Sequence, residues 1–251
     1  MRGSPLSSGT SGVRVVLGGG PLTPVIKGII IACVAVFLLQ AIAGGRVEAL
    51  FALSPAEVVY GLRLWQPLTY LFLHDPSNIL HLVFNMLMLW MFGTELERHW
   101  GSVPFLRFYL ICGAGAGLLS IALDPVARLV SGTGPWFSEV GTIGASGAIY
   151  GLLAAQGMLF PDRMLMVFLF FPMRMRPAVL LMAGITFYAA WLTPGSGINH
   201  IAHLGGMAIA WLILRRAWNL RQLLADWRWE RRRRRYRVVA DLRDDDFRRL
   251  Q

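Results

Sequence analysis

Gly144-Ala145-Ser146-Gly147 opens one long apolar segment of this chain, and His203 stands near the start of another. A polar side chain inside an apolar segment is costly in a membrane, so it must pair with another group or perform a function. Serine and histidine are also the smallest set that supplies a nucleophile and its general base. The two segments together predict a membrane protein that carries out hydrolysis within the bilayer.

The composition of the chain favours a membrane protein over a soluble one. Of its 251 residues, 55% are hydrophobic and only 15% are charged. The mean hydropathy of +0.54 lies well above that of soluble domains. The length allows one helical bundle and no second large domain. Two cysteines, Cys33 and Cys112, lie in apolar stretches, which favours core packing over a disulfide or a metal site.

Six apolar segments predict an all-α membrane protein built as a bundle of six transmembrane helices. The first segment starts too far from the N-terminus and is too long for a signal peptide, so we interpret it as an uncleaved signal anchor. The connection Gly44–Asn78 contains stretches typical of interfacial helices. The apolar stretch Met164–Phe171 is bounded by prolines and leaves room for a seventh short segment. The six segments are Val25–Ala43, Ile79–Gly93, Val103–Leu123, Ser146–Phe160, Pro177–Leu192 and Ile201–Leu214.

Positive charges predict the orientation of this bundle. With six spans and the N-terminus inside, all but three of the 24 lysine and arginine residues fall on the inner side. The positive-inside rule then places both termini in the cytoplasm. We expect a flexible cytoplasmic tail over residues 1–24, a six-span catalytic domain over residues 25–216 and a basic cytoplasmic tail over residues 217–251. Ser146 and His203 then lie at similar depth near the outer face, where a polar cavity must admit water.

Ser146 and His203 also have purely structural interpretations. A serine in the first turn of a helix commonly caps it, and glycines four residues apart, such as Gly147 and Gly151, form a surface for close helix packing. A histidine at the start of a span can hydrogen-bond to a carbonyl group. Gly206 belongs to a second small surface after the histidine. If the two surfaces pack together, His203 comes within reach of Ser146, as a nucleophile and base require.

A serine–histidine dyad is the hypothesis, because no acidic residue falls in the middle of a predicted span to complete a triad. Tyr150, one turn after the serine, is expected to stack on the imidazole. His81 and Asn85 lie four residues apart on one helix face. Their N–H groups can stabilise an oxyanion together with the backbone N–H of the serine. The alternative is a structural polar pair between helices.

Neither a metal nor a cofactor is expected at this site. Four histidines offer a metal-site alternative, but no cysteine or carboxylate accompanies them. They are His74, His81, His200 and His203.

Three motifs and three supporting positions occur in one order along the chain. The motifs are Gly144-Ala145-Ser146-Gly147, Ala202-His203-Leu204-Gly205-Gly206 and His81-Leu82-Val83-Phe84-Asn85, and the supporting positions are Trp65, Glu97 and Gly101-Ser102. In this set the chain resembles the rhomboid intramembrane serine proteases of the six-span bacterial type, over most of residues 25–216. The family often has arginine after the first-loop tryptophan, whereas this chain has Gln66, which leaves the anchoring of that loop open.

The resemblance implies a role for each motif residue. Ser146 is the implied nucleophile and His203 the implied general base. The implied oxyanion and substrate-binding residues are His81, Asn85 and Gly144, and the implied supporting residues are Tyr150, Gly147 and Gly206.

The resemblance also implies the partners and the location of the protein. We expect a multipass protein of the bacterial inner membrane that contacts the lipid bilayer and cuts transmembrane proteins, with its active site toward the outer face. The arginine run Arg231–Arg235 favours binding to anionic lipid headgroups, or fixing of the membrane topology, over binding to nucleic acid. Two alternatives are an inactive relative that only binds membrane helices and a transporter. Retention of both dyad residues argues against the first, and the lack of internal repeats argues against the second.

Overall fold

The computed structural model describes residues 20–130, 132, 137–139, 141–167, 171–192 and 199–215. The chain divides into two units, Met1–Ala210 and Trp211–Gln251, and every site residue discussed below lies in the first. Of the two predicted tails, the C-terminal one and all of the N-terminal one before residue 20 lie outside the described residues. The predicted domain limits therefore stay predictions.

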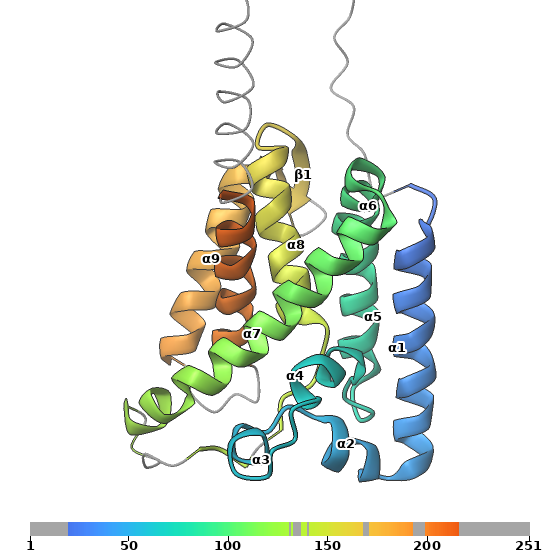
Figure 1. Ribbon diagram of the computed structural model, residues 1–251. Helices are drawn as coiled ribbons and strands as arrows, with labels where there is room; N and C mark the ends of the chain where they lie inside the picture. The colour runs from blue at the N-terminus through green and yellow to red at the C-terminus, as the bar shows by residue number, and fades with distance from the viewer. Residues whose placement is uncertain are drawn as a thin grey trace, which may run out of the picture. The chain divides into compact units, whose positions relative to one another are not determined.

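Helices make up most of the described chain, as Figure 1 shows. Within the first unit, the short helices of the first loop lie at one end, and α6 and the strand β1 lie at the other. The elements are α1 (Pro24–Ala43), α2 (Arg46–Phe51), α3 (Pro55–Val59), α4 (Gln66–Thr69), η1 (Tyr70–Phe72), α5 (Ile79–Met88), η2 (Leu89–Gly93), α6 (Thr94–Trp100), α7 (Ser102–Val130), α8 (Ser146–Leu159), β1 (Met164–Val167), β2 (Phe171–Arg174), α9 (Met175–Leu192) and an unlabelled last helix, His200–Arg215.

Three helices of the described chain are long and apolar enough to cross a membrane. They are Pro24–Ala43, the continuous stretch Ile79–Trp100, and Ser102–Val130. The stretch Met175–Ala190 of α9 and the helix His200–Arg215 are apolar but shorter, and α8 has 14 residues. Helices thus occur at all six predicted positions, while the crossing of the membrane by all six stays a prediction.

A buried carboxylate joins the beginnings of α1 and α7. Glu97 accepts hydrogen bonds from the backbone N–H groups of Val25 and Ile26 and from the hydroxyl groups of Thr23 and Ser102. These N–H groups lie in the first turn of α1, where a helix offers no internal acceptor. Glu97 and Ser102, two of the predicted supporting positions, therefore hold α1, α6 and α7 together at one end of the unit.

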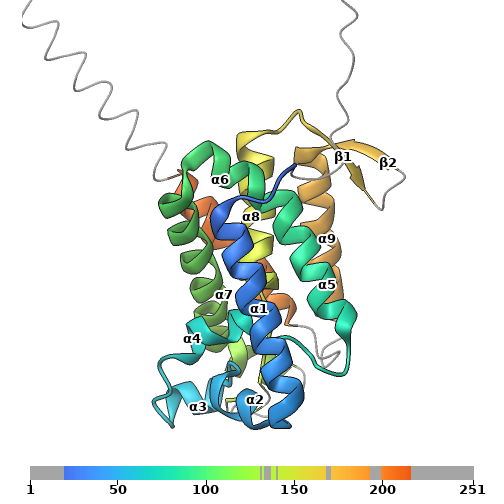
Figure 2. The same ribbon diagram turned by 90° about the vertical axis from the view of Figure 1, so that its right-hand side faces the viewer.

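The structure differs from the sequence-based prediction in two segments. Helix α7, the third predicted span, continues through Pro125 to Val130 rather than ending at Leu123. The apolar stretch after α8 forms the antiparallel hairpin β1–β2 and not a seventh helical segment, so the all-α prediction was wrong there. Figure 2 shows the hairpin beside the start of α9. Pro172 stands opposite Met166 in the ladder, in a two-stranded sheet where its missing N–H is tolerated.

The helix α8 lies inside the first unit, with α7, α9 and α5 around it (Figures 1 and 2). Nearly all of its residues from Gly147 to Gly157 are buried. A Cβ atom added at Gly151 would lie 2.8 Å from the Cβ of Cys112, and one added at Gly206 would collide with the carbonyl oxygen of Gly147. Small residues are therefore required where α8 meets α7 and the last helix. Both cysteines are buried and free, which confirms their predicted core role.

Replacing Gly206 by valine tests this contact. The added side chain has no room against the Gly147 carbonyl, so we expect a loss of about 1–3 kcal/mol in stability, as for other overpacked cores. Thermal unfolding in detergent measures the loss. Gly184→Val is the matched control, because a Cβ at Gly184 meets nothing within 4 Å. Equal melting temperatures for the two variants would show that the two helices do not touch at Gly206.

Candidate active site

Ser146 and His203 face each other across the contact between α8 and the last helix. The Oγ atom of Ser146 lies 2.7 Å from Nε2 of His203, a hydrogen-bonding distance. Ser146 is the first residue of α8, and the N-cap position before it is Ala145. The serine hydroxyl therefore pairs with the imidazole and does not cap the helix. Both side chains are half-buried.

Tyr150 holds one face of the His203 ring. The two rings stack with their centroids 4.4 Å apart and their planes 4° apart, as predicted from the spacing along α8. The tyrosine hydroxyl in turn accepts a hydrogen bond from Oγ1 of Thr186 on α9, at 3.1 Å. Sequence reasoning missed Thr186. Its signal was a polar residue in the middle of an apolar segment.

His81 lies beside the turn that precedes Ser146. A Cβ atom added at Gly144 would lie 3.0 Å from Nε2 of His81 and 3.8 Å from the serine Oγ, and Gly144 has a φ of +122°. The glycine thus keeps open a small space between the two groups. The Nδ1 atom of His81 accepts the backbone N–H of Asp75 at 3.3 Å. When the ring is neutral, its proton therefore stands on Nε2, the nitrogen beside this space.

Asn85 lies one turn after His81 on α5 and is buried. Its Nδ2 donates to the carbonyl oxygen of His81 at 2.7 Å. An amide group carries two N–H bonds, so this contact leaves a second one. The predicted pair thus shares a helix face and a hydrogen bond within α5, rather than bonding between helices.

A glutamine from α1 fixes the loop that holds His81. Both amide atoms of Gln40 bond to the backbone of His74, at 2.9 and 3.0 Å, which sets the position of the neighbouring Asp75. Gln40 was missed by sequence reasoning. The His74 ring is fully buried, 5.2 Å from the His81 ring. Burial, with a contribution from the nearby His81, lowers the pKa of His74 to about 4, so this imidazole is neutral at physiological pH.

The four histidines do not gather into a metal site. In the part of the chain that the structure describes, no group of three or more His, Cys, Asp or Glu residues is placed to hold a metal ion. The expectation of a site without metal or cofactor stays a prediction.

Asn199 positions the helix that carries His203. Its Oδ1 accepts the backbone N–H of Ala202 at 2.9 Å, which caps the helix. Its Nδ2 donates to the hydroxyl groups of Ser120 on α7 and Thr142 in the segment before α8, at 2.6 and 3.0 Å. One side chain thus joins the last helix to both of its neighbours. Its sequence signal, an asparagine directly before an apolar run, was available but not used.

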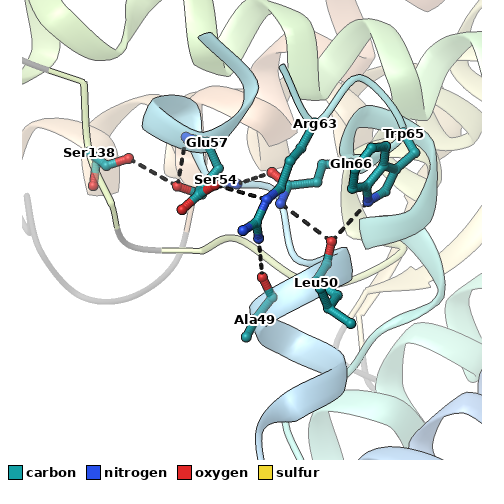
Figure 3. Close-up of polar contacts among 8 residues, drawn as sticks. All are labelled: Ala49, Leu50, Ser54, Glu57, Arg63, Trp65, Gln66 and Ser138. Carbon is teal, nitrogen blue, oxygen red and sulfur yellow. Dashed lines mark hydrogen bonds and ion pairs between the residues drawn. The ribbon is translucent and has the colours of Figure 1, made fainter. Parts of the chain in front are cut away.

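Gln66 anchors the first loop, as Figure 3 shows. Its side chain is 1% exposed. The Oε1 atom accepts the backbone N–H of Ser54 at 3.0 Å, and Nε2 donates to the carbonyl oxygen of Leu50 at 3.5 Å. Nε1 of Trp65 donates to the same oxygen at 2.9 Å. A glutamine in place of arginine therefore still ties the loop together.

The first loop also holds the segment that leads to Ser146. Leu53 and Thr142 exchange backbone hydrogen bonds of 2.9 and 2.8 Å. Farther along, the N–H of Gly144 donates to the carbonyl oxygen of Tyr70 at 3.0 Å, and the buried hydroxyl of Tyr70 donates to Gly113 on α7 at 2.8 Å. Burial raises the pKa of Tyr70, so this hydroxyl stays protonated and keeps its contact.

A cleft of about 780 Å³ lies between the first loop and the segment before α8. Three carboxylates, from Glu48, Glu57 and Glu139, take part in its lining. Neither Ser146 nor His203 lines it, so it is not the water-admitting cavity predicted at the serine.

Together, the apolar helices and the half-buried serine–histidine pair define an integral membrane protein with a helical bundle. A family model described as the rhomboid domain matches residues 61–218, more than half of the chain. The chain belongs to the rhomboid family, which confirms the resemblance seen in its motifs.

Several curated proteins are similar to part of the chain. Rhomboid protein 1, mitochondrial, of Saccharomyces cerevisiae is 35% identical over 127 residues, 50% of this chain and 34% of that protein. Rhomboid protease GlpG of Salmonella choleraesuis is 29% identical over 140 residues, 53% of this chain and 42% of that protein. Rhomboid protease GluP of Bacillus subtilis is 35% identical over 126 residues, 49% of this chain and 22% of that protein. The matches span less than half the length of these relatives.

Variants of Asn199 separate its cap from its two lateral contacts. Asn199→Ala removes all of them, and we expect it to cost about 1–3 kcal/mol in stability. Asn199→Ser keeps a capping oxygen but is too short for the other contacts, so its loss should be intermediate. Thermal unfolding in detergent measures both. The control is Asn78→Ala, because the Asn78 side chain makes no capping hydrogen bond to α5. If Asn199→Ala unfolds like this control, the asparagine does not hold the helix.

Proposed function

We propose that this chain is an intramembrane serine endopeptidase that cleaves membrane proteins within or beside their transmembrane segments, with Ser146 and His203 as a dyad. The observation that carries the proposal is the distance of 2.7 Å between Ser146 Oγ and His203 Nε2. Membership of the rhomboid family supports it, since two of the similar proteins are named as proteases.

The proposed reaction proceeds through an acyl-enzyme. Ser146 Oγ attacks the carbonyl carbon of the peptide bond while His203 Nε2 accepts the hydroxyl proton. The same nitrogen then donates this proton to the leaving amine, and the C–N bond breaks. A water molecule next gives a proton to Nε2 and attacks the ester. The proton returns to Ser146 Oγ as the new carboxyl group leaves.

The proposed oxyanion site uses three N–H donors. They are Nε2–H of His81, the second amide N–H of Asn85 and the backbone N–H of Ser146, which lies in the first turn of α8 and has no acceptor within the helix. The space that Gly144 keeps open beside His81 Nε2 is suited to the oxyanion. The positive end of the α8 dipole adds to the stabilisation of negative charge there.

The proposed setting of the reaction is the inner membrane of a bacterium. We propose six spans with both termini in the cytoplasm and Ser146 toward the outer face, transmembrane proteins as substrates, and no cofactor. The distribution of positive charge along the sequence supports this orientation.

Removal of either dyad residue tests the nucleophile and the base. Ser146→Ala and His203→Ala should each reduce cleavage of a model transmembrane substrate to background, because His203 is the base that hydrogen-bonds to the serine hydroxyl within the described part of the chain. The assay uses purified protein in detergent or bilayers, with circular dichroism to show that each variant is folded. Leu180→Ala, at an exposed position of α9, is the control and should cleave normally. Cleavage by folded Ser146→Ala would show that Ser146 is not the nucleophile. An inactive wild type would favour the alternative of an inactive relative that only binds membrane helices.

Removal of an oxyanion donor tests the second part of the site. Asn85→Ala and His81→Ala should lower kcat by about 10²–10³, with a smaller effect on KM, because the lost contact forms in the transition state. Steady-state cleavage kinetics measure both constants. A variant with full kcat and a much lower melting temperature would instead assign that residue a structural role.

A further inference from the structure

Thr186 is an unusual residue for its place on α9. Its side chain is 3% exposed, and it shares the buried face of the helix with Met175, Ala178 and Val179. The opposite face presents large apolar side chains, among them Leu180 and Phe187. A buried hydroxyl in an apolar span is stabilised only when it has a hydrogen-bond partner, so the partner of Thr186 accounts for its presence.

That partner is the Tyr150 hydroxyl, and helix packing brings the two groups together. Helices α8 and α9 run side by side and come close where Gly157 faces Val179, since a Cβ at Gly157 would lie 2.9 Å from a methyl carbon of Val179. Seven residues back along α8 stands Tyr150, and seven residues forward along α9 stands Thr186. Seven residues are about two helical turns. The hydrogen bond therefore lies in register with this antiparallel contact.

The hydrogen bond restrains the ring that stacks on His203. A tyrosine ring turns about two side-chain bonds, and its hydroxyl stands at the far end of the ring from them. Because the oxygen lies on the axis of the Cβ–Cγ bond, fixing it at 3.1 Å from Thr186 Oγ1 limits the swing of the ring about the Cα–Cβ bond, and with it the position of the ring. The two rings stack with their centroids 4.4 Å apart, so a displacement of the tyrosine ring forces the imidazole to follow or to lose its stacking partner.

His203 depends on this stacking for its orientation. Within the described residues, no carboxylate hydrogen-bonds to His203, so the usual third member of a triad does not orient its ring. We infer that Thr186 is a positioning residue that holds the Tyr150 ring, and through it keeps Nε2 of His203 directed at Ser146 Oγ. This inference rests on the proposed function, because its effect is expressed in the rate of cleavage.

Three variants test the inference by cleavage kinetics on a model transmembrane substrate. Thr186→Val keeps the shape of the side chain and removes the hydroxyl, whereas Thr186→Ser keeps the hydroxyl. Tyr150→Phe keeps the ring and removes the acceptor. Thr186→Val and Tyr150→Phe should each lower kcat by about tenfold, part of the 10²–10⁴ that a positioned base supplies, with KM unchanged. Thr186→Ser should restore most of kcat.

Coupling between the two sites gives a second measure. The double variant Thr186→Val/Tyr150→Phe should have the kcat of either single variant, because both remove the same hydrogen bond. Tyr188→Phe is the control, since the Tyr188 side chain is 63% exposed on α9, and it should cleave normally. Melting temperatures show that each variant is folded.

The outcomes separate the inference from the proposed function. Normal kcat for folded Thr186→Val, no recovery with Thr186→Ser, or additive losses in the double variant would each overturn the inference while wild-type cleavage stands. A wild-type chain that does not cleave, or a Ser146→Ala variant that does, would overturn both.

Discussion

The close approach of two helix backbones at Gly147 and Gly206 is the constraint on which the site depends. A side chain at Gly206 would collide with the carbonyl oxygen of Gly147, so α8 and the last helix can approach this closely only because residue 206 is glycine. One helix begins with Ser146 and the other carries His203 one turn after its start. Their contact thus places Oγ and Nε2 at 2.7 Å. A shift of about 1 Å between such groups can lower a rate about 100-fold.

Polar contacts from other elements hold Ser146 and His203 in this geometry. Asn199 joins the last helix to α7 and to the segment before α8, and that segment is held in turn by the first loop. On the other side, Gln40 fixes the loop whose backbone N–H bonds to His81. Each of these side chains has hydrogen-bond partners in an apolar bundle, where an unpaired one is costly. The hydrogen bonds that offset the cost of burying these side chains therefore also fix the geometry of the site.

Local spacing along the sequence predicted the parts of the site that lie on one helix or at a glycine surface. Tyr150 follows Ser146 by one turn, and Asn85 follows His81 by one turn, so both pairs could be placed from the helical period alone. Gln40 and Thr186 could not be placed, because their partners lie on other elements and a polar residue inside an apolar segment does not identify its partner. The β1–β2 hairpin was missed for a different reason. A short apolar run is compatible with either a helix or a strand, and only its pairing with a second segment decides between the two.

The central claim is that the packing of α8 against the last helix makes Ser146 the reactive hydroxyl of the protein. The most direct test is to treat the purified protein, in a lipid bilayer, with a fluorophosphonate and to map the modified residue by mass spectrometry of its peptides. The account predicts a single adduct on Ser146, absent when His203 is replaced by alanine. An adduct on a different residue, or full modification of Ser146 without His203, would contradict it.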